Sequence, residues 1–265
     1  MVLHPFHQAC GGRGSMNDVQ LFDGERIDDL QRDGLKIIQK KGAFCFGMDS
    51  VLLADFARVK KGSRLVDLGT GTGILPLLVH ARCRLGQAEA VEINPDAAER
   101  ARRTMELNAL GSVIHVIQGD LREIRTLLPH AQYDAVVCNP PYSRKDAALL
   151  SQNPDKRPAR QETECTLQDI AAAAKYLLRY HGHLFIMLPA ARSGELLSVL
   201  AETSLIPKQL RFVHSYLNAP ARLILVDAVK GASDGVIIQP PLITKNPDGT
   251  DTDEVKRIYD LPADE

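Results

Sequence analysis

The segment Asn139-Pro140-Pro141-Tyr142 follows a short apolar run and has the residue types of a reaction centre. Two consecutive prolines remove two backbone donors and fix two φ angles, so neither a helix nor a sheet continues through them. The Asn139 carboxamide is therefore held at a strand end, and the Pro140 carbonyl is left without a local hydrogen-bond partner. Two acceptors beside the flat ring of Tyr142 suit a planar substrate that carries an NH2 group.

A glycine-rich segment from Asp67 to Gly73 follows the first predicted parallel strand and leads into a helix. Gly69, Gly71 and Gly73 let the backbone approach a ligand closely, and the N-terminus of the helix offers free N–H groups. A dinucleotide-binding fingerprint would need glycine or alanine where Ile74 stands. The spacing fits instead a loop that binds S-adenosylmethionine, and an acidic Asp67 suits the cationic amino end of that cofactor.

Two further acidic residues end the next two strands. Glu92 stands where acids bind ribose hydroxyls in nucleotide folds. Alone it would be a solvated strand-end charge, but after the glycine loop we favour the ribose role. Asp120 can accept a hydrogen bond from an adenine amino group, with Leu121 against the ring. Its alternative role, compatible with the first, is to cap a short helix over 121–125.

These motifs lie in an alternation of strands and helices that begins at Arg64 and predicts a doubly wound, mainly parallel α/β sheet. The expected strands are 64–67, 88–93, 114–118, 135–138 and 183–188, followed by 207–214 and 223–229. The expected helices are 73–81, 95–109, 167–178 and 190–202. Ligands of such sheets bind beyond the carboxyl ends of the parallel strands, where each of these motifs falls.

The N-terminal part of the chain shows two different patterns. Residues 1–15 lack periodicity and are expected to form a disordered leader, with Met16 as an alternative start. Residues 16–47 are expected to form an N-terminal β extension, with strands at 21–27 and 35–39 around a polar turn.

The remaining residues, 48–265, are expected to form a single catalytic domain. Asp49 or Ser50 is expected to cap its first helix, which would run to about residue 58. An equally weighted interpretation places residues 47–50 at the edge of a ligand site. Near the end of the chain we expect a hairpin at about 235–243.

The composition sets limits on the partners of the chain. Of 265 residues, 45% are hydrophobic and 25% are charged, and the formal net charge is −1. Contact with a nucleic acid would then depend on a local basic patch. Five scattered cysteines without a CxxC pair predict reduced thiols and no metal site. No apolar run has membrane-spanning length and no signal peptide is visible, so we expect a cytoplasmic protein without a membrane partner.

A long polar segment, 143–166, follows the proposed reaction centre. Loops of this length in compact domains are usually functional or disordered. Its basic side chains, among them Arg144, Lys145 and Arg160, would meet RNA phosphates if the loop covers a base that is turned out of its stack. Because acidic residues are interspersed, a merely solvated loop is the alternative.

The order of acidic glycine loop, Glu92, Asp120 and Asn-Pro-Pro-Tyr resembles the class I methyltransferases that modify exocyclic amino groups. The resemblance is closer to one family within them, the bacterial tRNA(Val) adenine-N6 methyltransferases. The segments that look like this family are 25–28, 35–39, 46–53, 160–167, 211–214 and the prolines at 240–241. The resemblance extends over about 25–259.

This resemblance implies a seven-stranded Rossmann-like sheet with an antiparallel last strand, and methyl transfer from S-adenosylmethionine to N6 of adenine 37 in a valine tRNA. Asn139, Pro140, Pro141 and Tyr142 would be the catalytic residues. Tyr142, Arg144, Lys145 and Arg160 would contact the RNA. The residues expected at the cofactor are Phe46, Met48, Asp49, Asp67, Gly69, Thr70, Gly71, Thr72, Gly73, Glu92, Ile93, Asp120, Leu121 and Asn139. S-adenosylhomocysteine would be the product, and the protein a monomer or homodimer.

Three other functions stay open on the residues alone. A glutamine methyltransferase of release factors recognises an amide NH2 through the same motif, but such proteins carry a sizeable helical domain before the glycine loop. Adenine methylation in DNA or ribosomal RNA would use the same site. A non-catalytic cofactor- or RNA-binding module is disfavoured by the complete set of motifs. His214 and Tyr216, in a strand pattern, and Cys138, on a buried strand, are expected to be structural.

Overall fold

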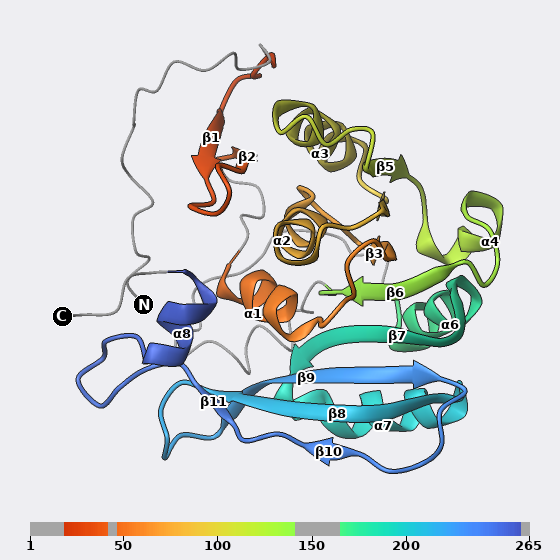
Figure 1. Cartoon of the computed structure of the whole chain (residues 1–265), viewed down its shortest axis with the longest axis vertical. Coiled ribbons are helices and arrows are strands. Elements are labelled where there is room, and N and C mark those ends of the chain that lie inside the picture. The colour runs from red at the N-terminus through yellow and green to blue at the C-terminus, as the bar shows by residue number, and fades with distance from the viewer. Residues whose placement is uncertain (1–18, 42–46, 141–164, 261–265) are drawn as a thin grey trace.

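A nine-stranded sheet forms the centre of the protein (Figure 1). The computed structural model describes residues 19–41, 47–140 and 165–260. Seven strands follow the order β5-β4-β3-β6-β7-β9-β8, and β9 is antiparallel to both of its neighbours. They are β3 (Arg64–Leu68), β4 (Gln87–Glu92), β5 (Ile114–Gln118), β6 (Tyr133–Cys138), β7 (Leu178–Pro189), β8 (Leu205–His214) and β9 (Ala221–Lys230). The prediction of a doubly wound, mainly parallel sheet with an antiparallel last strand is confirmed.

Helices cover both faces of this sheet, as Figure 1 shows. One face carries α1 (Met48–Phe56), α2 (Ile74–Cys83) and α3 (Pro95–Leu107). The other carries η1 (Leu121–Glu123), α4 (Ile124–Leu127), α6 (Leu167–Leu177), η2 (Ala190–Arg192) and α7 (Ser193–Glu202). Along β3, Leu65 belongs to the first core, whereas Val66 and Leu68 belong to the second. Because side chains alternate along a strand, Asp67 faces the side of α1 and α2.

The start of α1 differs from its prediction. Gly47 is the N-cap residue, and no side chain makes the capping hydrogen bond. Asp49 and Ser50 lie inside the first turn, so the expectation that one of them caps the helix is wrong. The helix also ends at Phe56, two residues earlier than expected. Most of α1 is apolar and buried. Its packing against α2 and β7 therefore stabilises the helix, which has no side-chain cap.

The N-terminal extension forms a separate two-stranded antiparallel sheet of β1 (Glu25–Asp29) and β2 (Lys36–Lys40). The first strand starts later than predicted, since the chain turns before it: the Glu25 N–H donates to the Phe22 carbonyl. Strand β2 packs against α3. There the Thr104 side chain accepts a hydrogen bond from the Ile38 N–H, 3.2 Å away.

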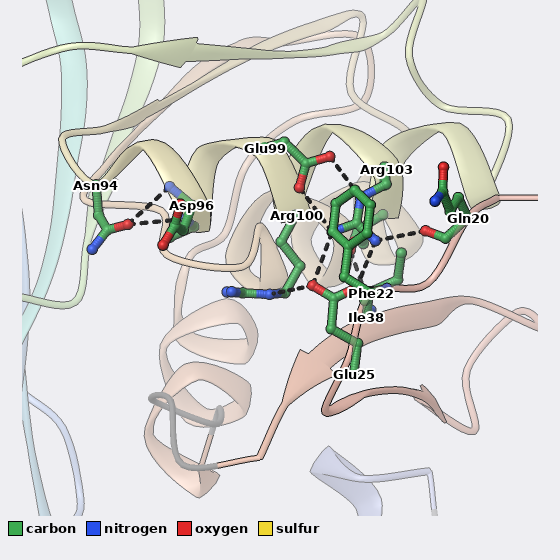
Figure 2. Close-up of polar contacts among 11 residues, drawn as sticks. Gln20, Phe22, Glu25, Ile38, Asn94, Asp96, Glu99, Arg100 and Arg103 are labelled. Atoms are coloured by element: carbon green, nitrogen blue, oxygen red, sulfur yellow. Dashed lines mark hydrogen bonds and ion pairs between the residues drawn. The ribbon is translucent and has the colours of Figure 1, made fainter.

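An ion-pair cluster ties this extension to α3 (Figure 2). The Glu25 carboxylate, only 2% exposed, accepts from two nitrogens of Arg103 at 2.7 and 2.9 Å and from Arg100 Nε at 3.2 Å. Glu99 binds the same Arg103 guanidinium, whose Cζ lies 4.3 Å from the centre of the Phe22 ring. Above all through the hydrogen bonds from Arg103, the cluster lowers the pKa of Glu25 to about 2.

The C-terminal segment runs along the outer edge of β8. Two short strands, β10 (Ile237–Ile238) and β11 (Leu242–Ile243), both pair with β8 in parallel, one after the other. The expected hairpin at 235–243 is therefore wrong, since the two strands do not pair with each other. The short helix α8 (Asp253–Ile258) follows and packs against α1.

Candidate active site

The carboxyl ends of β6, β3, β4 and β5 lie in that order along one edge of the sheet. Each ends at one of the predicted motifs, so Asn139, the loop 68–73, Glu92 and Asp120 form a row. Neighbouring strands are about 4.8 Å apart, so the row spans about 15 Å. This length suits a nucleoside that carries an amino-acid substituent.

The glycine loop makes a tight turn between β3 and α2. The N–H groups of Gly69 and Thr70 both donate to the Val91 carbonyl, at 2.9 and 3.0 Å. Gly73 has a φ of 84° and is the N-cap residue of α2. A Cβ atom there would lie 2.4 Å from Met105 Cε on α3. The positive φ is therefore what calls for glycine here, because the Met105 methyl group is the end of a flexible side chain and could move.

Asp67 carries a buried carboxylate beneath this loop. The residue is 0% exposed, and neither carboxylate oxygen accepts a hydrogen bond from the residues that the structure describes. Burial raises its pKa to about 7; the nearby Thr70 hydroxyl opposes this shift, and the charge of Glu92 adds to it. The Thr70 Oγ1 atom is likewise buried without a hydrogen-bond partner in the described chain. A carboxylate in this state favours the arrival of a cation with N–H donors.

Glu92 is held in place by the backbone on both sides of it. Its Oε2 accepts from the Gly71 N–H and its Oε1 from the Asn94 N–H, both at 2.8 Å. Each oxygen keeps a second lone pair for a ligand hydroxyl. The next residue, Ile93, is 51% exposed and presents an apolar surface beside the carboxylate.

Asp120 is the N-cap residue of η1 and accepts a hydrogen bond from the Arg122 N–H at 2.9 Å. The Arg122 guanidinium also binds both carboxylate oxygens, with Nε 2.8 Å from Oδ2. The hydrogen bonds from Arg122 lower the pKa of Asp120. The sequence did not reveal this partner. An adenine amino group would have to share the carboxylate with it.

Asn139 lies at the end of β6, beside the first turn of α1. Its Nδ2 atom is 3.4 Å from the Ser50 Oγ atom, and Ser50 is 2% exposed. Its Oδ1 atom is buried and has no hydrogen-bond partner among the described residues. The neighbouring Pro140 is also buried. One of two equally weighted interpretations of the sequence placed residues 47–50 at the edge of a ligand site, but the contact between Ser50 and Asn139 was not predicted.

The other predicted site residues divide into two groups. Met48 lies in the first turn of α1 and packs against the core. The next residue is Asp49. Burial is the main cause of the raised pKa of Tyr259 in the C-terminal segment, and the charge of Asp49 adds to it. The residues that fall outside the described part of the chain are Phe46, Pro141, Tyr142, Arg144, Lys145 and Arg160. Cys138 is buried, and its thiol contacts the Leu68 carbonyl at 3.2 Å.

Within the described ranges, no group of three or more His, Cys, Asp or Glu residues could hold a metal ion. None of the helices in the same ranges combines the length and the hydropathy needed to cross a bilayer.

A glycine loop, strand-end acids and a strand-end asparagine on this sheet define a Rossmann-like methyltransferase. The family model "Methyltransferase small domain" matches residues 34–212, and the chain belongs to this family. Three similar proteins share one name, tRNA1(Val) (adenine(37)-N6)-methyltransferase. They come from Bacteroides fragilis (27% identical, 70% of this chain and 77% of that one), Cronobacter sakazakii (33%, 65% and 71%) and Tolumonas auensis (34%, 62% and 67%). The chain is a member of the tRNA1(Val) (adenine(37)-N6)-methyltransferase family.

Solved structures show the same fold. A predicted O-methyltransferase from Agrobacterium tumefaciens superposes with a TM-score of 0.64 at 22% identity, over 80% of this chain and 95% of that one. Geranyl diphosphate C-methyltransferase from Streptomyces coelicolor, solved with S-adenosyl-L-homocysteine, gives 0.51 at 14% identity, over 68% and 74%.

Proposed function

We propose that this protein transfers a methyl group from S-adenosylmethionine to N6 of an adenine in tRNA, with adenine 37 of a valine tRNA as the substrate. The observation that carries the proposal is the pair of unsatisfied polar groups on neighbouring strands. Among the described residues, the carboxylate of Asp67 near the end of β3 and the carbonyl oxygen of Asn139 after β6 have no hydrogen-bond partner. Buried polar groups without partners are uncommon in folded proteins, and beside the glycine loop at the edge of the sheet a ligand would supply the missing contacts of these two.

The residues along the sheet edge fit S-adenosylmethionine in a defined order. The Asp67 carboxylate suits the ammonium group of the methionine part. Glu92 accepts from the ribose hydroxyls through its remaining lone pairs. Ile93 and Leu121 would lie against the adenine ring, and the Asp120 carboxylate would accept a hydrogen bond from its amino group. When bound, the cofactor supplies a methyl group on a positively charged sulfur.

The protein's own contribution to the reaction lies at Asn139 and Pro140. The lone pair of an adenine amino group is delocalised into the ring, so this nitrogen is a poor nucleophile. The Asn139 Oδ1 atom and the Pro140 carbonyl accept hydrogen bonds from its two protons and favour a tetrahedral nitrogen. These bonds strengthen as positive charge develops on the nitrogen, which lowers the barrier. The remainder of the catalysis is in-line positioning.

The choice of tRNA rests on the relatives, whose name specifies adenine 37 of tRNA1(Val). The same acceptor pair would also bind the amide of a glutamine side chain, so a release factor is the competing substrate. The name shared by the relatives favours the tRNA.

The test uses purified protein, labelled S-adenosylmethionine and unmodified valine tRNA. We expect one methyl group on N6 of adenine 37, located by digestion and mass spectrometry. Asn139→Ala should abolish transfer and leave the dissociation constant of S-adenosylhomocysteine unchanged. Labelling of a release factor, with no labelling of tRNA, would overturn the substrate assignment.

A further inference from the structure

The β8–β9 hairpin extends beyond the active-site edge of the sheet. Strand β8 is parallel to β6, whereas the arrow of β9 points away from this edge (Figure 1). Through β7 and β9, Cys138 is level with Leu210 of β8. The hairpin then continues to the pair of His214 and Ala221 before it turns. Strand spacings place its tip about 20 Å from Asn139.

Hydrogen bonds hold the main chain of this tip in one conformation. The His214 Nδ1 atom lies 2.7 Å from the Ala219 carbonyl oxygen, and the Ala219 N–H donates to the Tyr216 carbonyl at 3.0 Å. From the neighbouring segment, the Lys245 N–H donates to the Ser215 carbonyl at 2.9 Å. A tip braced in this way presents its side chains in fixed positions at little entropic cost on binding.

The side chains at the braced tip are exposed and of three different kinds. Tyr216 is 45% exposed and Leu217 is 73% exposed. Arg222, at the start of β9, is exposed, and its Nη1 atom lies 3.5 Å from the Ser215 Oγ atom. Tyr216 thus lies in a loop, so the expectation that it stands in a strand is wrong.

We propose that Tyr216, Leu217 and Arg222, together the hairpin tip, bind unpaired nucleotides of the RNA substrate close to the target adenine. The inference rests on the proposed function, because it assumes that RNA is the substrate. Turning a base out of its stack exposes the faces of neighbouring bases, and an aromatic ring with an adjacent apolar side chain offers them a new stacking surface. The guanidinium pairs with a phosphate of the same strand.

Two observations favour RNA over a protein partner at the hairpin tip. The tip stands on the same edge as Asn139, so a polynucleotide held at the reaction centre can reach it without leaving the protein. It also combines a base-stacking ring with a positive charge, and because the chain as a whole has a net charge of −1, contact with RNA depends on local basic groups such as Arg222.

The experiment compares Tyr216→Ala with Tyr216→Phe and with Tyr180→Ala. Tyr180 is a matched control: it is 67% exposed and lies near the amino end of β7, at the opposite edge of the sheet. We expect Tyr216→Ala to raise the KM for valine tRNA about tenfold, with kcat and the dissociation constant of S-adenosylhomocysteine unchanged. Tyr216→Phe keeps the stacking ring and should stay within about twofold of wild type, as should Tyr180→Ala.

A second measurement addresses the phosphate contact. Arg222→Gln should reduce the slope of log Kd against log salt for the anticodon stem-loop by about 0.7, the value for one contact with single-stranded RNA. If wild type methylates tRNA but Tyr216→Ala keeps its KM, the hairpin-tip proposal alone fails. If wild type neither binds nor methylates RNA, the proposed function fails with it. A lower oligomeric mass for Tyr216→Ala in light scattering, with unchanged RNA binding, would make the tip a protein interface and overturn the proposal.

Discussion

Asn139 and Ser50 form a contact between the reaction centre and the helix that precedes the glycine loop. The Asn139 Nδ2 atom lies 3.4 Å from the Ser50 Oγ atom, and the carboxamide oxygen on the other side has no partner among the described residues. Under the proposed function, a carboxamide with its NH2 group directed at Ser50 would present its oxygen to the substrate. Ser50 would then be a positioning residue for Asn139.

Ser50→Ala should lower kcat about 10- to 100-fold, because a carboxamide free to rotate loses the alignment of its oxygen. The dissociation constant of S-adenosylhomocysteine should not change. Ser63→Ala removes another buried serine, at the amino end of β3, and serves as the control. Steady-state kinetics on valine tRNA measure the effect; a parallel loss of cofactor affinity would show that Ser50 acts on the cofactor instead.

Cofactor binding should depend on pH through Asp67. Burial raises its pKa to about 7, so below this pH the carboxyl group keeps its proton and must release it to meet an ammonium group. We expect the affinity for S-adenosylhomocysteine to rise toward pH 7 by up to about tenfold per pH unit, and then to level off. Calorimetry across about pH 5 to 7.5 measures it, and Asp67→Asn should bind weakly without this dependence.

The raised pKa of Asp67 also affects the stability of the free protein, which should fall as the pH rises, whereas cofactor affinity should increase. Because the folded state keeps the Asp67 proton up to about pH 7 while an unfolded chain loses it near 4, the free protein should lose stability as the pH rises from about 4 to 7. Asp67→Asn should remove this loss, as measured by urea unfolding without cofactor. If the free energy of unfolding depended on pH in the same way for wild type and for Asp67→Asn, the raised pKa of Asp67 would be contradicted.

The Glu25 cluster should contribute to stability at neutral pH and lose this contribution in acid. Its carboxyl pKa is lowered to about 2, so the contribution is present above the ordinary value near 4.5 and is lost as the pH falls toward 2. At neutral pH, Glu25→Gln should reduce the free energy of unfolding by about 2–3 kcal/mol, since it leaves two buried arginines short of a charge partner.

Denaturant unfolding at about pH 7 and pH 3 tests this prediction. The difference in the free energy of unfolding between Glu25→Gln and wild type should be smaller at the lower pH. Glu99→Gln is the matched control, because Glu99 binds the same Arg103 but its side chain is 43% exposed. Equal losses for the two variants would contradict the special role of Glu25.

Asp120 and Arg122 can be separated by their effects on cofactor binding. Arg122→Ala should change the dissociation constant of S-adenosylhomocysteine less than about threefold, because the backbone N–H of residue 122 still orients the carboxylate. Asp120→Ala should weaken it about tenfold. S-inosylhomocysteine, which lacks the adenine amino group, should bind both variants and wild type with similar affinity. A tenfold loss of affinity for this ligand in Asp120→Ala would show that Asp120 acts as the N-cap residue of η1 and not through the amino group.

The central strands were predictable because short apolar segments between turn residues indicate buried strands. Strand β5 has the expected bounds, and β3, β4 and β6 differ by one or two residues at an end. Strand β7 begins five residues earlier than expected, since its start pairs with Tyr133 across a register shift. Such a pairing depends on the neighbouring strand and leaves no local sequence pattern.

The site was predictable where a functional residue directly follows the carboxyl end of a parallel strand. The row of Asn139, the glycine loop, Glu92 and Asp120 follows from that rule and from the strand order. Contacts between distant segments were not predictable: Ser50 reaches Asn139 from a helix, and two prolines near 240 suggested a turn where the chain runs along β8. The pairing of Arg122 with Asp120 is local, but side-chain geometry alone decides it.

The Glu25 cluster also has a consequence for the order in which the protein assembles during synthesis. The partners of Glu25, Arg100 and Arg103, lie 75 and 78 residues further along the chain. At about 5–20 residues per second, the extension waits on the order of 4–16 s on the ribosome before its arginines exist. The two strands of the extension therefore cannot make these contacts until α3 has been synthesised.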